Sequence, residues 1–143
     1  MAGVLKLADY LELVARRRWC PGDLDCCTFM ADWLMSRGWP DPMSDRRGTY
    51  RDRPTFRRML KSEGGIIESC STRFSAIGLS RTNSPSAGDV ALVQAPFAVR
   101  RGRVLRRPIG AICVSKDAVA VVTPDAGMVV SAIPIVNAWA VNG

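Results

Sequence analysis

The chain has 143 residues and a formal net charge of +7, with 48% hydrophobic and 23% charged residues. This length can bury one hydrophobic core, and the apolar content excludes an intrinsically disordered chain. No run approaches the ~18 apolar residues of a membrane span. Lys6, Asp9 and Glu12 interrupt the N-terminal segment, which therefore lacks the apolar run of a signal peptide. We expect one domain over residues 1–143, made in a cytoplasm and without a membrane span.

The cysteines are odd in number and irregularly spaced, which favours free thiols over a disulfide framework. A zinc site would need four ligands, and the paired CxxC spacing that indicates such a site is absent. We therefore predict no metal site and no cofactor, and we interpret the cysteines as small buried residues. They are Cys20, Cys26, Cys27, Cys70 and Cys113.

Apolar residues recur at helical spacing in the first half of the chain. They predict a first helix over about residues 6–17. After a turn, a second helix carries an apolar face from Cys26 onward and ends at Gly38, a residue type that commonly stops helices. Two further short helices are predicted around residues 56–60 and 66–74. The helical part thus occupies about residues 1–77.

The second half is rich in valine, alanine and isoleucine, a composition typical of strands. The four prolines in this half are expected at strand ends or edges, because proline lacks the backbone N–H that a central strand needs. Helices followed by a series of strands predict an α+β fold, with N-terminal helices packed on a mostly antiparallel sheet or half-barrel over about residues 89–143. The strands are predicted at about 89–95, 103–115, 118–123, 127–133 and 137–142, and the prolines are Pro96, Pro108, Pro124 and Pro134.

The positive charge comes mainly from clustered arginines, and the densest cluster surrounds Gly102. So many adjacent like charges predict an exposed hairpin tip. Such a tip is a solvated surface, an interface with an acidic protein, or a contact with nucleic-acid phosphates. The sequence carries no zinc-finger or RNP-type signature that would favour the third option. The arginines of this candidate partner interface are Arg100, Arg101, Arg103, Arg106 and Arg107.

Four short motifs, taken in order, resemble the NlpC/P60 (papain-like) proteins. The segment Asp25-Cys26-Cys27-Thr28-Phe29 is similar to the family's Asp-Cys-Ser-Gly-Phe type motif, which opens a helix. Gly88-Asp89-Val90 is similar to the Gly-Asp-Val motif that starts the first sheet strand. Pro108-Ile109-Gly110 is similar to a His-Val-Gly motif on the next strand. The closing Ala138-Trp139-Ala140-Val141 resembles the last strand of related small proteins encoded among tail genes of tailed phages and prophages.

The resemblance implies a papain-like fold with Cys26 at the position of the attacking nucleophile. A cysteine in the first helical turn is well placed to become a thiolate. Amide hydrolysis also needs an acid–base partner, and the chain contains no histidine. Proline occupies the histidine's position, and the lysine and aspartate that could substitute, Lys116 and Asp117, lie at an expected exposed turn. We therefore interpret Cys26 as a vestigial nucleophile position and Asp25 as a helix cap.

The combined prediction is a noncatalytic structural or assembly component of a phage tail, with the tail tip as the expected place. Its expected partners are other tail proteins, with DNA in the tail lumen as a further possibility, and no small-molecule ligand is expected. The protein would be made in the bacterial host cytoplasm and incorporated in the virion tail. One alternative is a peptidoglycan-cleaving cysteine peptidase that uses Cys26 with a non-histidine base. A second alternative is a nonspecific nucleic-acid-binding basic domain.

Overall fold

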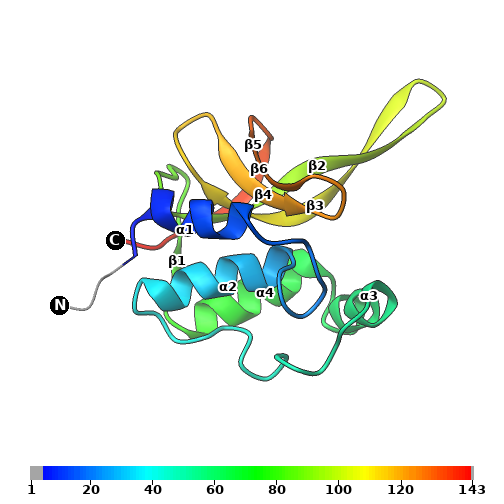
Figure 1. Ribbon diagram of the computed structural model, residues 1–143. Helices are drawn as coiled ribbons and strands as arrows, with labels where there is room; N and C mark the ends of the chain where they lie inside the picture. Colours follow the sequence, from blue (N-terminus) through cyan, green and yellow to red (C-terminus); the bar gives the residue numbers. More distant parts are fainter. Residues whose placement is uncertain (1–4, 143) are drawn as a thin grey trace.

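A computed structural model describes residues 5–142, in which helices precede strands along the chain (Figure 1). The predicted domain limits at residues 1 and 143 lie outside this range. Within it, no helix is long and apolar enough to cross a membrane. The helices are α1 (Leu7–Ala15), α2 (Cys26–Ser36), α3 (Arg53–Ser62) and α4 (Ile66–Ala76). The strands are β1 (Ser80–Arg81), β2 (Val90–Arg100), β3 (Arg103–Cys113), β4 (Val119–Thr123), β5 (Gly127–Ser131) and β6 (Ile135–Ala140).

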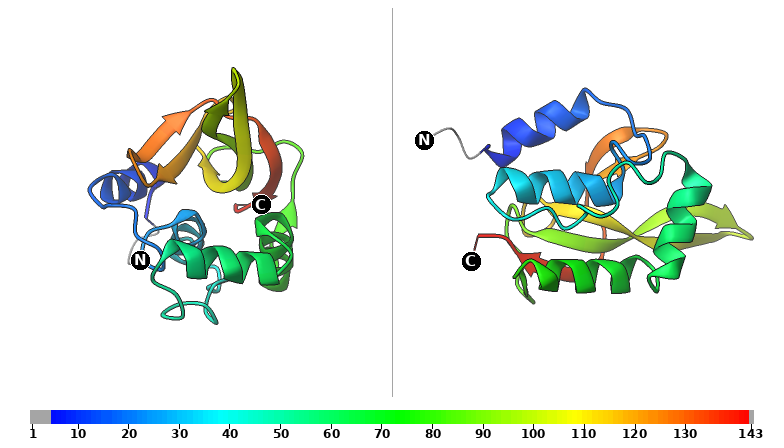
Figure 2. Two further views of the ribbon diagram at one scale, coloured as in Figure 1. Left: turned by 90° about the vertical axis from the view of Figure 1, so that its right-hand side faces the viewer. Right: turned by 90° about the horizontal axis from the view of Figure 1, so that it is seen from below.

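Helix α2 is the most buried of the four helices, with apolar side chains around most of its circumference. Such a helix is expected between other layers of a domain rather than on the surface. It lies against β3 on one side and is flanked by α1 and α4 (Figures 1 and 2). After its last turn, Gly38 adopts a φ of 93°, which favours glycine and ends the helix as predicted.

The six strands form one open antiparallel sheet in the order β1-β6-β2-β3-β4-β5. The predicted α+β class with an antiparallel sheet is therefore confirmed. The helices cover one face of the sheet, as the views of Figures 1 and 2 show. Figure 2 also shows that the sheet is strongly curved.

Alternate residues of the strands pack on opposite faces of the sheet, as the two-residue period of a strand requires. The face toward the helices carries large side chains such as Leu92, Ile112 and Trp139, which join the main core. The opposite face carries a second cluster of mostly small residues, including Ala91 and Ala111, with no helix residue among its buried members.

The structure corrects several predicted strand boundaries. Strand β2 does not end at residue 95 but continues through Pro96 to Arg100, and the two-residue strand β1 was not predicted. Both Pro96 and Pro108 lie inside strands, at positions where the strand is open on one side. Beyond residue 94, β2 pairs only with β3, and β3 pairs with β4 only at Ile112 and Cys113. An open edge needs no N–H donor, so proline is tolerated there.

Candidate functional site

The first turn of α2 holds the residues that the sequence singled out. The Asp25 side chain accepts hydrogen bonds from the backbone N–H groups of Cys27 and Thr28, both at 2.9 Å. The Thr28 hydroxyl in turn accepts from the Asp25 N–H at 2.8 Å, which completes a reciprocal capping box. This cap fixes the start of the helix and places Cys26 in its first turn.

The second carboxylate oxygen of Asp25 is also occupied. It accepts from the Gly22 N–H at 2.8 Å and from the Tyr50 hydroxyl at 2.5 Å, and the aspartate is fully buried. Burial and the nearby Asp25 charge together raise the pKa of Tyr50. Because both oxygens are held by protein donors, Asp25 has a structural role at this position.

Sequence reasoning missed Tyr50 as a partner of Asp25. The two residues are 25 positions apart and share no periodic pattern, so only the folded chain brings them together. Gly22 was an indirect signal in the sequence, because glycine is typical of turns. In the structure it has a φ of 85°. A side chain there would place its Cβ 2.4 Å from the Tyr50 carbonyl oxygen, so the loop containing Tyr50 approaches closely only because residue 22 is glycine.

Cys26 is a buried thiol in the structure. A hydrogen bond with the neighbouring Cys27 thiol, together with burial, raises the pKa of Cys26 well above its ordinary value. These effects outweigh the backbone N–H of Gly110, which lowers the pKa. The position of Cys26 in the first helical turn predicted a lowered pKa, and this prediction is wrong because the Cys27 thiol and burial have the larger effect. At neutral pH the Cys26 sulfur is therefore protonated and a poor nucleophile.

Strand β3 brings the segment that resembles the histidine motif against Cys26. Helix and strand approach so closely at Gly110 that an added Cβ would lie 2.6 Å from the Cys26 carbonyl oxygen. Pro108 precedes Gly110 by two residues and therefore lies on the same face of the strand. Its ring has no group that can donate or accept a proton. The segment thus offers Cys26 a backbone N–H at Gly110 but no side chain that can transfer a proton.

Lys116 and Asp117, the candidate substitutes for histidine, lie in the exposed turn between β3 and β4. This turn follows the end of β3, six residues after Gly110, which corresponds to roughly 20 Å of extended chain. The structure therefore does not bring either side chain to Cys26.

The Gly88-Asp89-Val90 motif ties the start of β2 to the end of the chain. The buried Asp89 side chain accepts hydrogen bonds from the N–H groups of Ser86 at 2.9 Å and Val141 at 3.0 Å. The Gly88 carbonyl accepts from the Trp33 indole at 2.8 Å, which connects the motif to α2. The Asp89 carboxylate and the Gly88 carbonyl are thus both occupied by protein donors, so the role of the motif is structural.

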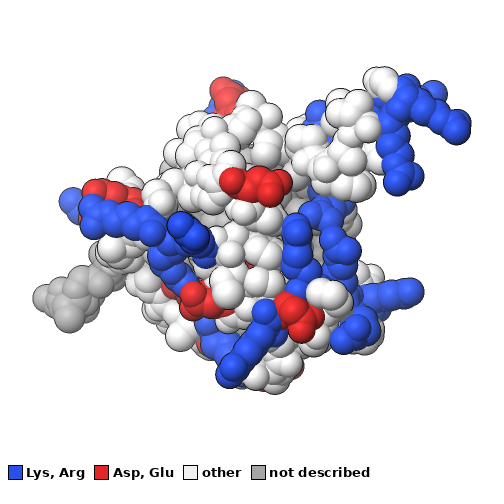
Figure 3. Space-filling model, turned by 45° about the vertical axis from the view of Figure 1, so that its right-hand side comes forward, with Lys and Arg blue, Asp and Glu red and all other residues white. Residues whose placement is uncertain are grey.

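The predicted basic hairpin is a two-stranded ribbon that projects from the sheet, at the upper right of Figure 1. We call residues 96–107 the arm. Its strands are joined by Arg101 and Gly102, with φ values of 51° and 75°. Positive φ at both central residues is typical of the tight turns that match the twist of a hairpin. Figure 3 shows basic side chains gathered at the end of the arm, away from the body of the molecule.

The five arginines of the arm fall into two groups. Arg106 donates a hydrogen bond to the Gln94 carbonyl at 3.0 Å, and the Arg107 guanidinium lies 5.1 Å from the centre of the Phe97 ring. The side chains of Arg100, Arg101 and Arg103 make no hydrogen bond or ion pair with residues 5–142. These three tip arginines are exposed charges without a side-chain partner among the residues that the structure describes.

The arm also exposes apolar side chains that the sequence analysis did not single out. Phe97, Val99 and Val104 are 50%, 69% and 52% exposed. The pattern Phe-Ala-Val before the arginines is the alternation of a strand, but the proline at position 96 indicated that the strand had already ended.

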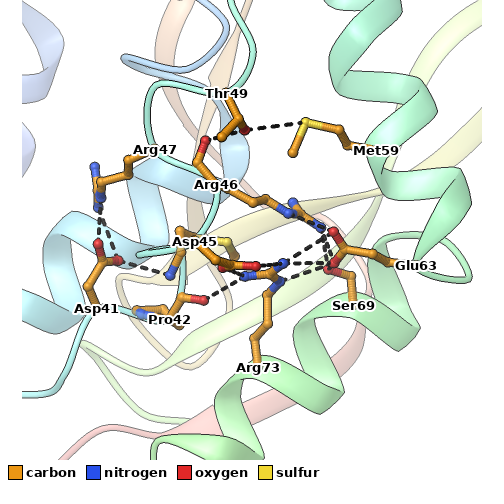
Figure 4. Close-up of polar contacts among 11 residues, drawn as sticks. Asp41, Pro42, Asp45, Arg46, Arg47, Thr49, Met59, Glu63, Ser69 and Arg73 are labelled. Atoms are coloured by element: carbon orange, nitrogen blue, oxygen red, sulfur yellow. Dashed lines mark hydrogen bonds and ion pairs between the residues drawn. The ribbon is translucent and has the colours of Figure 1, made fainter.

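Arginine and carboxylate side chains form a second polar cluster beside α4 (Figure 4). Glu63 accepts from Arg46 at 2.9 Å and from Ser69 at 2.8 Å, and it also pairs with Arg73. Arg73 reaches Asp45 at 2.5 Å. These charges neutralise one another and hold the loop after α2 against α4. The cluster therefore stabilises the fold.

A family described as a domain of unknown function (DUF6950) matches residues 5–141. The chain belongs to this family. No curated protein and no solved structure matches the chain.

Proposed function

We propose that this chain is a noncatalytic structural or assembly component of a tailed-phage tail, built on an NlpC/P60-like domain. The arrangement of α2 against β3 supports this proposal. Cys26 opens a helix that packs at Gly110, and these are the two places that the sequence resemblance pairs in an active site.

The observation that carries the noncatalytic assignment is the state of Cys26. Its thiol is buried, its pKa is raised, and the residue two positions before Gly110 is proline. Amide hydrolysis needs a thiolate and an acid that protonates the departing nitrogen. Loss of one member of such a unit typically costs several orders of magnitude in rate. The domain therefore serves as a building block and not as a peptidase.

The test compares native protein with Cys26→Ala on bacterial cell-wall fragments, using both the purified domain and the assembled particle. A partner subunit can supply a histidine in the particle, so both forms are needed. Cys113→Ala, which removes a buried thiol in the cluster on the other face of the sheet, is the matched control. We expect no release of peptides that depends on Cys26. Release by native protein and the control, but not by Cys26→Ala, would establish the peptidase alternative.

A second measurement tests the place of the protein in the tail. Mass spectrometry of purified particles is expected to find the chain in a fixed ratio to other tail proteins. Its absence from finished particles would assign it to tail assembly. Absence from particles together with normal particle formation after deletion of the gene would exclude both the structural and the assembly role.

A further inference from the structure

The arm carries features of a docking element. We propose that the arm inserts into a groove on a partner protein whose floor is apolar and whose rim is acidic. This inference rests on the proposed noncatalytic role and names the chemistry of the partner. The tip arginines would pair with carboxylates on the rim, and the exposed valines would cover the apolar floor.

The charge arrangement at the tip is unfavourable in the isolated chain. Arg100 and Arg103 are directly opposite each other in the β2–β3 register, and Arg101 lies in the turn between them. Like charges at directly opposite positions destabilise an antiparallel pair. Within residues 5–142 these three guanidinium groups have no carboxylate partner, whereas Arg46, Arg47 and Arg73 all do. An acidic partner removes the repulsion at the tip.

The apolar side chains of the arm favour a protein over nucleic acid. Val99 and Val104 are directly opposite each other, so they form one apolar patch on the same face of the ribbon. Phosphate groups gain nothing from contact with exposed valine, because their contacts are polar and charged. Protein interfaces combine an apolar centre with arginine, and this is the composition of the arm.

The edges of the arm favour side-chain docking over addition of a partner strand. Pro96 and Pro108 each remove a backbone donor on strands whose outer edges are open, and the register of β2 shifts between Pro96 and Ala98. Proline, an irregular register and charged side chains all oppose edge-to-edge strand pairing. The partner therefore recognises the side chains of the arm.

Site-specific photocrosslinking tests the proposal in cells that produce the complete assembly. The photoreactive residue p-benzoylphenylalanine replaces Val99, and in a control chain it replaces Val130, which is 48% exposed on β5. The Val99 probe is expected to yield an adduct with one protein, at a peptide that contains apolar residues flanked by aspartate or glutamate. The Val130 probe is expected to yield none with that peptide.

Charge variants then test the role of the arginines. Replacement of Arg100, Arg101 and Arg103 by glutamine is expected to weaken binding to the crosslinked protein by at least ~30-fold, the level of an interface hot spot. Replacement of the exposed lysines Lys6, Lys61 and Lys116 by glutamine removes the same charge elsewhere and is expected to change binding by less than ~3-fold. Both variants are expected to fold, because every replaced side chain is exposed, and thermal melting verifies this.

Reversal of charge gives the decisive comparison. Arg103→Glu should abolish binding, and a glutamate-to-arginine change in the crosslinked peptide should restore it. The proposal is overturned by an adduct with DNA or with a second copy of this chain, by the absence of any adduct at Val99, or by binding that survives loss of the tip arginines. None of these results depends on Cys26, so failure here is distinguishable from discovery of peptidase activity.

Discussion

Asp25→Ala tests whether the buried carboxylate at the start of α2 is a structural element. The substitution removes the cap of the helix, which typically costs about 1 kcal/mol. It also removes the acceptor of the Gly22 N–H and of the buried Tyr50 hydroxyl. Hydrogen bonds to a charged group contribute about 1.5–3 kcal/mol each, and a buried hydroxyl without an acceptor is costly. Together these losses are expected to lower the free energy of unfolding by about 4–7 kcal/mol.

Urea unfolding, followed by the fluorescence of the buried Trp33 and Trp139, measures this loss. Asp52→Ala is the matched control, because the exposed Asp52 side chain caps α3 by accepting a single hydrogen bond from the Thr55 N–H at 2.7 Å. We expect the control to lose only about 0.5–1 kcal/mol. Equal losses for the two variants would refute the reasoning.

A double-mutant cycle isolates the bond between the two buried groups. Tyr50→Phe removes the hydroxyl that donates to Asp25, so Asp25→Ala in that background no longer leaves a hydroxyl without an acceptor. The double variant should therefore be more stable than the sum of the single losses predicts, by about 1–2 kcal/mol. Strict additivity would show that the two side chains do not depend on each other.

Three further predictions concern the packing, the thiols and the ion pairs. Gly110→Ala should destabilise the fold by about 1–3 kcal/mol in urea unfolding, because its Cβ would lie 2.6 Å from the Cys26 carbonyl oxygen; an unchanged stability would contradict this contact. At pH 7, iodoacetamide should modify the exposed Cys20 at least ~100-fold faster than Cys26, as read by peptide mass spectrometry, since the raised pKa and burial of Cys26 keep its thiolate scarce; comparable rates would refute this. Burial raises the pKa of the Glu63 carboxyl, but its hydrogen bonds, with Arg46 foremost, outweigh burial and lower it. The stabilisation from Glu63 is then fully present above its usual pKa of about 4.3 and is lost as the pH falls through the lowered value. In urea unfolding, the stability difference between wild type and Glu63→Gln should therefore shrink below about pH 4. A difference that stays constant across this pH range would contradict the prediction.

The sequence predicted the elements whose causes are local. Helix α2 has a capping aspartate, a threonine three residues later and a glycine after its last turn, and each of these acts within a few residues. The strand regions were predicted for a similar reason, because β-branched residues and turn signals recur along the chain. The α+β class follows from the order of these local patterns.

Features that depend on distant residues could not be predicted in the same way. Proline commonly ends a strand, so the sequence predicted that β2 ends before Pro96. The strand continues because its edge is open at this position, and the edge is open because β6 stops pairing with β2 before it. The contact between Asp25 and Tyr50 leaves no periodic trace in the sequence. The pKa direction of Cys26 depends on burial and on the neighbouring Cys27 thiol, which the helix position alone does not reveal.

Strand β3 carries both Pro108 and one side of the arm, and one structural feature accounts for both. Because β4 pairs with β3 only at Ile112 and Cys113, the preceding part of β3 has an open edge. Proline fits at position 108 because an open edge needs no backbone N–H, and the proline ring carries no group that can transfer a proton. The same lack of a neighbour lets β2 and β3 continue away from the sheet as a free ribbon. A longer β4 that paired along all of β3 would require a donor at position 108 and would cover one edge of the arm. The projecting arm and the proline at position 108 therefore both depend on the shortness of β4.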